Sequence, residues 1–298
     1  MTASPVAVLW SLGRSVVVFG RMIRFSHSIF ALPFALAGVI FAYRWSGVPV
    51  RGATWFWVAV AMVGARTAAM AFNRLADRHL DAANPRTANR ELPRGVIGPA
   101  TVAGLTLVAS AVFLLAARML NPLCFALAPV ALAIVLGYSY TKRFTWACHF
   151  FLGLSLAVAP VGGWVAVTGR LDPLPFLLAF GVLAWSAGMD IIYALQDETF
   201  DRDHGVHSLP GRFGRRAALR VAAISHGAAV VALLALATRM SLSIWYPLGV
   251  GLGALLLLYQ HRVVGPGDLR RISFAFFDLN GLFSVLYLGT AAAGVYLR

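Results

Sequence analysis

The chain of 298 residues is strongly apolar: 60% of its residues are hydrophobic, only 12% are charged, and its mean hydropathy is +0.78. Soluble domains carry about 25% charged residues, so this composition excludes an ordinary soluble protein and predicts a polytopic helical membrane protein. A net charge of +14 in a soluble protein would point to nucleic acid. Here the basic residues flank apolar runs, which indicates anionic lipid heads and anionic substrates as partners, and no nucleic acid.

The predicted fold is an all-α bundle of nine transmembrane helices. Residues 1–25 are expected to form a cytoplasmic or interfacial N-terminal arm, and residues 26–298 a single transmembrane domain. Each apolar run is close to the roughly 20 residues that cross the hydrocarbon core of a bilayer. In chain order the runs are Ser26–Tyr43, Trp55–Phe72, Ile97–Ala117, Pro122–Tyr140, Trp146–Val167, Pro173–Leu195, Ala217–Ala237, Ile244–Tyr259 and Ile272–Leu297.

The distribution of Lys and Arg predicts the orientation of this bundle. With the N-terminus inside, 18 of the 25 basic residues fall on inside segments and 6 on outside segments, while Arg66 lies within a span. Positive charge accumulates on the cytoplasmic side of membrane proteins, so this bias favours a cytoplasmic N-terminus. The protein is therefore expected in a bacterial-type inner membrane, with any site at the inside ends of its helices facing the cytoplasm.

The first acidic stretch, Asn73–Asp81, ends the second apolar run. Asn73, Asp77 and Asp81 are spaced i, i+4, i+8, so on a helix their side chains share one face. Their hard oxygens suit Mg²⁺, which typically takes one or two carboxylates together with phosphate oxygens and water. The alternative is an ordinary polar helix end that leaves the membrane.

The second acidic stretch, Asp190–Asp203, favours the metal interpretation. Asp190, Asp197 and Asp201 again fall on one helical face, at i, i+7 and i+11. Seven of the 11 acidic residues in the chain lie in these two short stretches, although chance would scatter them over the loops. Two facing clusters could hold Mg²⁺ ions that bridge a diphosphate and offset the charge that develops on a leaving group.

Arg66 and Asp190 are the charged residues expected at depth in the membrane. A buried arginine is costly unless it meets an anion or water, so Arg66 is predicted to bind a carboxylate or phosphate of a substrate. The alternative is a structural ion pair, for example with Asp190. Asp190 could otherwise orient an acceptor molecule, together with Tyr193, or act as a base.

Several basic and phenolic residues near the acidic stretches are candidates for diphosphate binding. These are Tyr138, Lys142, Arg143 and Arg78, together with Arg86, Arg90 and Arg94 of the intervening loop, which could close over a diphosphate. The alternative for all of them is an anchor at the membrane interface. The histidines, among them His149, show no metal-ligand spacing and are interpreted as core or interfacial residues.

The two acidic stretches resemble the paired aspartate-rich motifs of the UbiA superfamily of intramembrane prenyltransferases. The resemblance covers nearly the whole chain, although Arg74 stands where the family usually has a second acid. Within the superfamily the chain is similar to the 4-hydroxybenzoate polyprenyltransferase-like group. The segments Phe25–Pro33, Asn84–Thr87 and Lys142–Trp146 look like the branch associated with menaquinone made through futalosine.

The resemblance implies Mg²⁺-dependent transfer of a polyprenyl group from its diphosphate to a hydroxylated aromatic carboxylate, either dihydroxynaphthoate or 4-hydroxybenzoate, in menaquinone or ubiquinone biosynthesis. Asn73, Asp77, Asp81, Asp197 and Asp201 would then bind Mg²⁺, and Asp77, Asp197 and Asp190 would be catalytic. Arg66, Asp190 and Tyr193 would bind the acceptor. A haem- or chlorophyllide-type acceptor, and a transporter that uses the acids as an ion pathway, are the alternatives.

Overall fold

The computed structural model describes residues 18–20, 22 and 30–297, so the predicted arm over residues 1–25 lies almost entirely outside the described residues. These residues form helices and no strand, apart from one isolated bridge between Gly265 and Asp268. The α-helices are α2 (Leu32–Ser46), α3 (Gly52–Ala76), α4 (Arg78–Ala83), α5 (Pro99–Leu120), α6 (Pro122–Thr141), α7 (Cys148–Thr168), α8 (Leu174–Ala194), α9 (Glu198–Asp203), α10 (Leu209–Arg239), α11 (Trp245–Val263), α12 (Ile272–Phe274) and α13 (Asn280–Tyr296). A 3₁₀ turn, η2 (Leu195–Asp197), joins α8 to α9, and a π-helical turn, η3 (Ala275–Leu279), joins α12 to α13.

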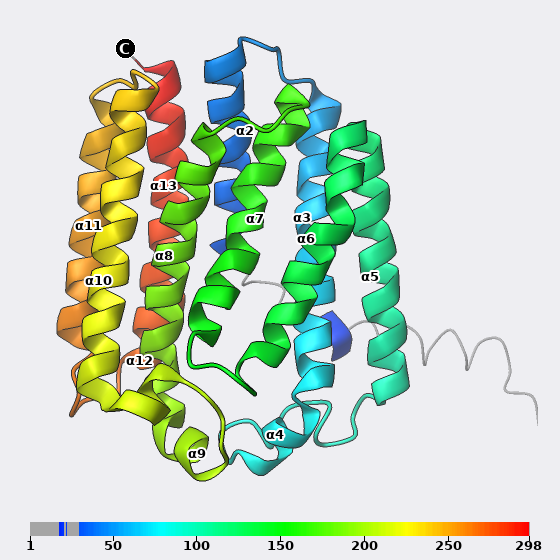
Figure 1. Cartoon of the computed structure of the whole chain (residues 1–298), viewed down its shortest axis with the longest axis vertical. Helices are drawn as coiled ribbons and strands as arrows, with labels where there is room; N and C mark the ends of the chain where they lie inside the picture. The colour runs from blue at the N-terminus through cyan, green and yellow to red at the C-terminus, as the bar shows by residue number, and fades with distance from the viewer. Residues whose placement is uncertain (1–17, 21, 23–29, 298) are drawn as a thin grey trace, which may run out of the picture.

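Seven helical segments of the described residues are long and apolar enough to cross a membrane. They are α3, α5, α6, α7, the segment from α8 to α9, α10 and the segment from α12 to α13. The helices α2, with 15 residues, and α11, with 19 residues, run alongside them in Figure 1 but are not among the seven. The all-helical membrane fold is therefore confirmed, while nine spans and a cytoplasmic N-terminus stay predictions.

A side-chain cap at Ser208 determines where α10 begins. Ser208 has extended backbone angles, and its Oγ accepts a hydrogen bond from the backbone N–H of Gly211 at 3.2 Å. Pro210 follows within the first turn, where proline suits the helical φ angle and removes an N–H that would have no intrahelical partner. The first turn of α10, which begins at Leu209, is therefore held in a defined position.

Helix α7 packs closely between α2 and α8 because it presents glycine to both. A Cβ atom at Gly163 would collide with the backbone carbonyl of Ala35 on α2, and one at Gly153 with that of Leu183 on α8. Small residues at such crossings let helix backbones approach closely. Close packing matters in a membrane because lipid tails are as apolar as the side chains, so little hydrophobic driving force holds the helices together. This packing places the first turn of α7 beside the C-terminal part of α8.

Both acidic stretches lie at one end of the bundle. Figure 1 shows α4 and α9 together at the lower end, opposite the C-terminus. Each stretch bends at its aspartate: Asp77 has φ −91° and ψ 4°, Asp197 has φ −101° and ψ 5°, and each is followed by a helix of six residues. We call residues 73–81 the first acidic turn and residues 190–203 the second acidic turn.

The bend corrects the expectation of one continuous helix through each acidic stretch. Helix α3 ends at Ala76, and Asp77 adopts the bridge conformation that is common at active sites. The i+4 backbone hydrogen bonds nevertheless continue, from Asp77 N–H to the Asn73 carbonyl at 2.9 Å and from Asp81 N–H to the Asp77 carbonyl at 2.7 Å. The predicted common face of Asn73, Asp77 and Asp81 is therefore retained across the bend.

Candidate active site between the two acidic turns

A cavity of about 710 Å³ is lined by residues of both acidic turns. Twelve of the residues predicted from the sequence line it: Arg66, Asn73, Asp77, Asp81, Arg86, Arg90, Tyr138, Lys142, Asp190, Tyr193, Asp197 and Asp201. They come from α3, α4, α8, η2 and α9, from the ends of α3 and α6, and from the loop between α4 and α5, which are far apart in the sequence. The fold therefore brings the two acidic turns to a shared space at one end of the bundle.

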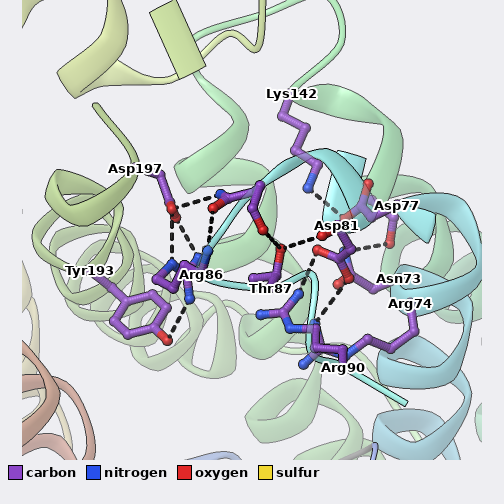
Figure 2. A network of polar contacts seen from close by, with 12 residues as sticks. Asn73, Arg74, Asp77, Asp81, Arg86, Thr87, Arg90, Lys142, Tyr193 and Asp197 are labelled. Atoms are coloured by element: carbon purple, nitrogen blue, oxygen red, sulfur yellow. Dashed lines mark hydrogen bonds and ion pairs between the residues drawn. The ribbon is translucent and has the colours of Figure 1, made fainter. Parts of the chain in front are cut away.

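Asp77 is the most enclosed carboxylate of the first acidic turn, with 2% of its surface exposed. Its Oδ2 accepts hydrogen bonds from Asn73 Nδ2 at 3.0 Å and from Lys142 Nζ at 2.5 Å. Arg143 approaches Oδ1 at 3.4 Å and also donates to the backbone carbonyl of Ala76 at 2.7 Å. The end of α6 thus supplies two cations to the bend at the end of α3; Figure 2 shows Lys142 directed at Asp77.

Asp81 lies between two arginines. Arg90 Nη1 donates to Oδ1 at 2.6 Å, while Arg74 Nη1 lies 3.7 Å from Oδ2. Oδ2 is buried and has no hydrogen-bond partner among the described residues. Because a buried carboxylate oxygen without a hydrogen bond is costly, this atom is suited to receive a ligand cation or a donor group.

Loop 84–98, between α4 and α5, closes onto the second acidic turn. Arg86 donates to both oxygens of Asp197, from Nε at 2.9 Å and from Nη2 at 2.5 Å, and to the hydroxyl of Tyr193 at 3.2 Å. Asn84 Nδ2 adds a hydrogen bond to Asp197 Oδ1 at 2.9 Å. Partial burial lowers the pKa of Arg86, but its bond to Asp197 outweighs this and raises the pKa above its ordinary value.

Thr87 anchors the same loop to the first acidic turn, because its Oγ1 donates to the backbone carbonyl of Asp81 at 2.9 Å. Figure 2 shows Arg86, Thr87 and Arg90 between the carboxylates of the two turns. Loop 84–98 therefore links the two acidic turns directly.

Asp190 and Tyr193 form another wall of the cavity. Asp190 Oδ2 lies 2.7 Å from Nδ1 of His149, a residue of the first turn of α7. The ring of Tyr193 packs against Phe276 with a centroid distance of 4.1 Å, and the Arg86 guanidinium lies 5.3 Å from the Tyr193 centroid. This wall offers a carboxylate and aromatic faces side by side.

Arg78, Arg94 and Arg143 are exposed and are not among the residues that line the cavity. Arg78 follows Asp77 directly, and neighbouring helical positions diverge by about 100°, so its side chain leaves on another face. Its predicted part in diphosphate binding has no support in this placement. Arg143 contacts the site through Asp77 and through the backbone carbonyls of Ala76 and Ser139.

The sequence interpretation missed Asn84, Thr87, Arg74 and the His149–Asp190 pair. Asn84 and Thr87 belong to a segment rich in turn-forming residues. That composition predicts a loop, but it does not predict that Asn84 contacts Asp197 or that Thr87 contacts Asp81. The sequence presents Arg74 only as the loss of a metal ligand, whereas in the structure it is buried beside Asp81. His149 and Asp190 are 41 positions apart, and no local spacing indicates their contact.

The donor set is suited to Mg²⁺ bound together with a phosphate ligand. Within the described residues no group of three or more His, Cys, Asp or Glu side chains could hold a metal ion by itself. Mg²⁺ does not need such a cage, because it usually combines one or two carboxylates with phosphate oxygens and water. Five Asp and five Lys or Arg residues line the described part of the cavity, so a bound diphosphate calls for added positive charge.

The cavity continues from this polar end into an apolar region. Its lining there includes Val58, Met62, Phe113, Leu127 and Val158. Val130, Leu154 and Phe176 also line it and are exposed on the outside of the bundle, so the apolar region reaches the surface that would face lipid. The cavity thus joins a charged compartment to an apolar groove.

Comparisons with known proteins agree on one family. The model of the UbiA prenyltransferase family matches residues 31–283. A 4-hydroxybenzoate octaprenyltransferase of Vibrio parahaemolyticus is 27% identical over 98% of this chain and 99% of its own length. The apo structure of a UbiA homologue from Aeropyrum pernix superposes with a TM-score of 0.82 and 33% identity over 90% of this chain and 97% of its own. A UbiA homologue from Archaeoglobus fulgidus bound to DMAPP and Mg²⁺ shares the fold, with a TM-score of 0.70 and 18% identity over 94% of this chain and 99% of its own.

Proposed function

This chain belongs to the UbiA prenyltransferase family, and we propose that it transfers a polyprenyl group from a polyprenyl diphosphate to a hydroxylated aromatic carboxylate, with Mg²⁺ as cofactor. The observation that carries this proposal is the single cavity that joins both acidic turns to an apolar groove at the bundle surface. A diphosphate head needs the charged compartment, and a polyprenyl tail needs the groove.

Asn73, Asp77 and Asp81 would hold Mg²⁺ on one side of the diphosphate, and Asp197 and Asp201 on the other. When bound, Mg²⁺ supplies charge stabilisation to the departing diphosphate. The support for this assignment is the hard-oxygen donor set, the buried Asp81 Oδ2 without a hydrogen bond, and the related structure that contains DMAPP and Mg²⁺.

Lys142, Arg86 and Arg90 line the cavity and are bound to the carboxylates by charge-assisted hydrogen bonds. In the proposed reaction these three side chains would turn from the carboxylates to the diphosphate oxygens and stabilise the leaving group. Tyr138 lines the same space and would contribute a hydroxyl donor. Loop 84–98 would at the same time exclude water, which would otherwise trap the allylic carbocation.

The acceptor would lie between Arg66 and the wall of Asp190 and Tyr193. Arg66 would bind its carboxylate, and the rings of Tyr193 and Phe276 would pack against its aromatic ring. The C1–O bond breaks to release diphosphate and give the allylic carbocation, and the ring carbon ortho to the hydroxyl then attacks C1. Asp190 accepts the hydrogen bond of the hydroxyl and receives the proton that leaves the ring.

The described part of the chain is an integral membrane protein by its seven candidate spans and its family. We further propose that the active site faces the cytoplasm of a bacterial-type inner membrane. The support is the excess of basic residues on the connections at the end of the bundle that carries α4 and α9. The C-terminus lies at the opposite end.

Two acceptors fit the proposed site, 4-hydroxybenzoate and dihydroxynaphthoate, because both carry a carboxylate and a hydroxyl on an aromatic ring. Transfer to them would place the protein in ubiquinone or menaquinone biosynthesis, respectively. Curated relatives act on the first, as their names state. The segments Phe25–Pro33, Asn84–Thr87 and Lys142–Trp146 favour the second by resemblance.

The test is a transfer assay with protein purified in detergent, Mg²⁺ and a labelled polyprenyl diphosphate, in which both acceptors are offered in parallel. We expect a prenylated, Mg²⁺-dependent product with one of them. A reaction that proceeds equally well after removal of all divalent metal would contradict the cofactor assignment. No product with any hydroxylated aromatic carboxylate would overturn the proposed function.

A further inference from the structure

His149 connects three helices through its two ring nitrogens. It lies in the first turn of α7 and has 2% of its surface exposed. Nδ1 lies 2.7 Å from Oδ2 of Asp190 on α8, and Nε2 accepts a hydrogen bond from the backbone N–H of Leu209 on α10 at 3.2 Å. Each nitrogen thus has one defined partner.

The bond from Leu209 determines which nitrogen carries the proton. A backbone N–H can only donate, so Nε2 must present its lone pair and carries no hydrogen. The proton of a neutral imidazole then resides on Nδ1, which donates to Asp190. A doubly protonated ring would set its Nε2–H against the Leu209 N–H.

The donor at Leu209 is itself held rigidly. Leu209 is the first residue of α10, where the N–H has no partner within the helix, and Ser208 caps that turn. The tautomer of His149 is therefore imposed by the backbone, and it does not depend on the conformation of another side chain.

Both residues of this pair line the cavity, but Asp190 is the more accessible of the two. Its side chain is 23% exposed, compared with 3% for His149. The Nδ1–H group binds Oδ2 from the buried side, which leaves the rest of the carboxylate available to the cavity. Because the Nε2 lone pair is already engaged by Leu209, His149 has no route to pass a proton onward.

We propose that His149 is a positioning residue, a neutral imidazole that holds the Asp190 carboxylate in the orientation in which it can receive the acceptor proton. This inference rests on the proposed function, in which Asp190 is the proton acceptor. The arrangement follows the general pattern in which a base is itself oriented by a third group. Here the order is Leu209 N–H, His149, Asp190 and acceptor.

The kinetic test compares two substitutions at one position. His149→Leu removes both nitrogens, and we expect kcat to fall about 100-fold because the reacting carboxylate loses its orientation. The KM for the prenyl diphosphate should stay unchanged, since neither residue binds it. His149→Asn keeps an N–H donor near the position of Nδ1 and should restore most of kcat. Equal impairment of both variants, or near-wild-type turnover of His149→Leu, would overturn the proposal.

A double substitution shows whether His149 acts through Asp190. His149→Leu should cause no further loss in an Asp190→Asn background, because the residue it positions is already disabled. Independent, multiplicative losses would refute the coupling. Thermal unfolding in detergent establishes that each variant is folded before its kinetics are compared.

A spectroscopic test needs no activity. In protein labelled with ¹⁵N-histidine, the signal that disappears in His149→Asn should show a neutral ring protonated at Nδ1. A ring protonated at Nε2, or at both nitrogens, would overturn the proposal even if His149→Leu failed to fold. If the wild-type enzyme transferred no prenyl group to aromatic acceptors while this signature was present, the proposed function would fail and the hydrogen-bond assignment would stand.

Discussion

Arg86 donates to both carboxylate oxygens of Asp197, from Nε at 2.9 Å and from Nη2 at 2.5 Å. The residues are 111 positions apart, so the loop that follows the first acidic turn closes onto the second. Lys142 donates to one oxygen of Asp77, and Arg90 to one oxygen of Asp81. Three of the five proposed metal ligands, Asp77, Asp81 and Asp197, are thus engaged by cations of the chain, so binding of Mg²⁺ and diphosphate requires an exchange of partners.

Arg86→Gln is expected to lower kcat/KM for the prenyl diphosphate about 10- to 100-fold, because it removes a bidentate donor from the leaving group. Arg86→Lys should recover only part of the loss, since an ammonium keeps the charge but not the planar pair of donors. The measurement is initial rate against polyprenyl diphosphate concentration. Arg239→Gln, an exposed arginine at the end of α10, is the matched control and should behave as wild type.

A stability measurement on Arg86→Gln distinguishes a role of Arg86 in binding the leaving group from a purely structural role. The side chains of Arg86 and Asp197 are 31% and 15% exposed, and a pair this accessible to solvent is expected to contribute about 1 kcal/mol to the free energy of unfolding. The melting temperature in detergent should therefore stay close to wild type. A large loss of stability with unchanged kinetics would mean that the pair with Asp197 only holds the loop.

Mg²⁺ is expected to bind weakly to the protein alone and strongly together with a non-hydrolysable prenyl diphosphate analogue. The reason is that Lys142, Arg86 and Arg90 compete with Mg²⁺ for the carboxylates. When a diphosphate is bound, these basic side chains pair with its oxygens and leave the carboxylates free for Mg²⁺. Arg90→Gln frees Asp81 from its 2.6 Å contact, so it should raise the affinity of the substrate-free protein for Mg²⁺ while it lowers turnover. Isothermal titration with Mg²⁺ measures this directly. Equal Mg²⁺ affinity with and without the analogue would contradict the exchange.

The helices could be predicted from the sequence because the residues that begin and end each helix are close to it in the sequence. The predicted span Pro122–Tyr140 agrees with α6 at Pro122–Thr141, where an asparagine cap and a proline mark the start. The shared face of Asn73, Asp77 and Asp81 also follows from spacing alone, since it needs only the i+4 geometry of a helix. The bend at Asp77 was missed, because no proline or glycine stands there to mark it.

The contacts between segments could not be predicted in the same way. The bond of Arg86 to Asp197 and that of His149 to Asp190 join segments whose relative position depends on the packing of whole helices. The sequence indicated that loop arginines could reach a diphosphate, but it gave no reason to prefer Arg86 and Arg90 over Arg94. Loop 84–98 is anchored by Thr87 to the backbone of the first acidic turn, and the path of this loop directs Arg86 and Arg90, but not Arg94, into the cavity.

Asp77→Asn and Asp197→Asn should each reduce Mg²⁺-dependent transfer at least 100-fold, because each removes a charged oxygen ligand at nearly constant volume. Both proteins should still fold in detergent. Asp268→Asn, which changes an exposed acid paired with Arg270, is the control for loss of one carboxylate and should keep normal activity. Near-wild-type turnover of either site variant at saturating Mg²⁺ would show that the metal assignment is wrong.

Arg66→Gln tests the proposed recognition of the acceptor. Arg66 lines the cavity from within α3, a candidate membrane span, where a charge-assisted bond to a carboxylate is shielded from water. We expect the KM for the aromatic carboxylate to rise about 100-fold, with little change in the KM for the prenyl diphosphate. The decisive comparison uses the corresponding phenol or naphthol without a carboxylate. Wild type should discriminate strongly against it, whereas Arg66→Gln should accept both compounds about equally poorly, because the partner of the carboxylate is gone. If Arg66→Gln instead raised the KM for the prenyl diphosphate and left the preference for the carboxylate intact, Arg66 would belong to the donor side of the cavity, and acceptor recognition would have to reside in the wall of Asp190 and Tyr193.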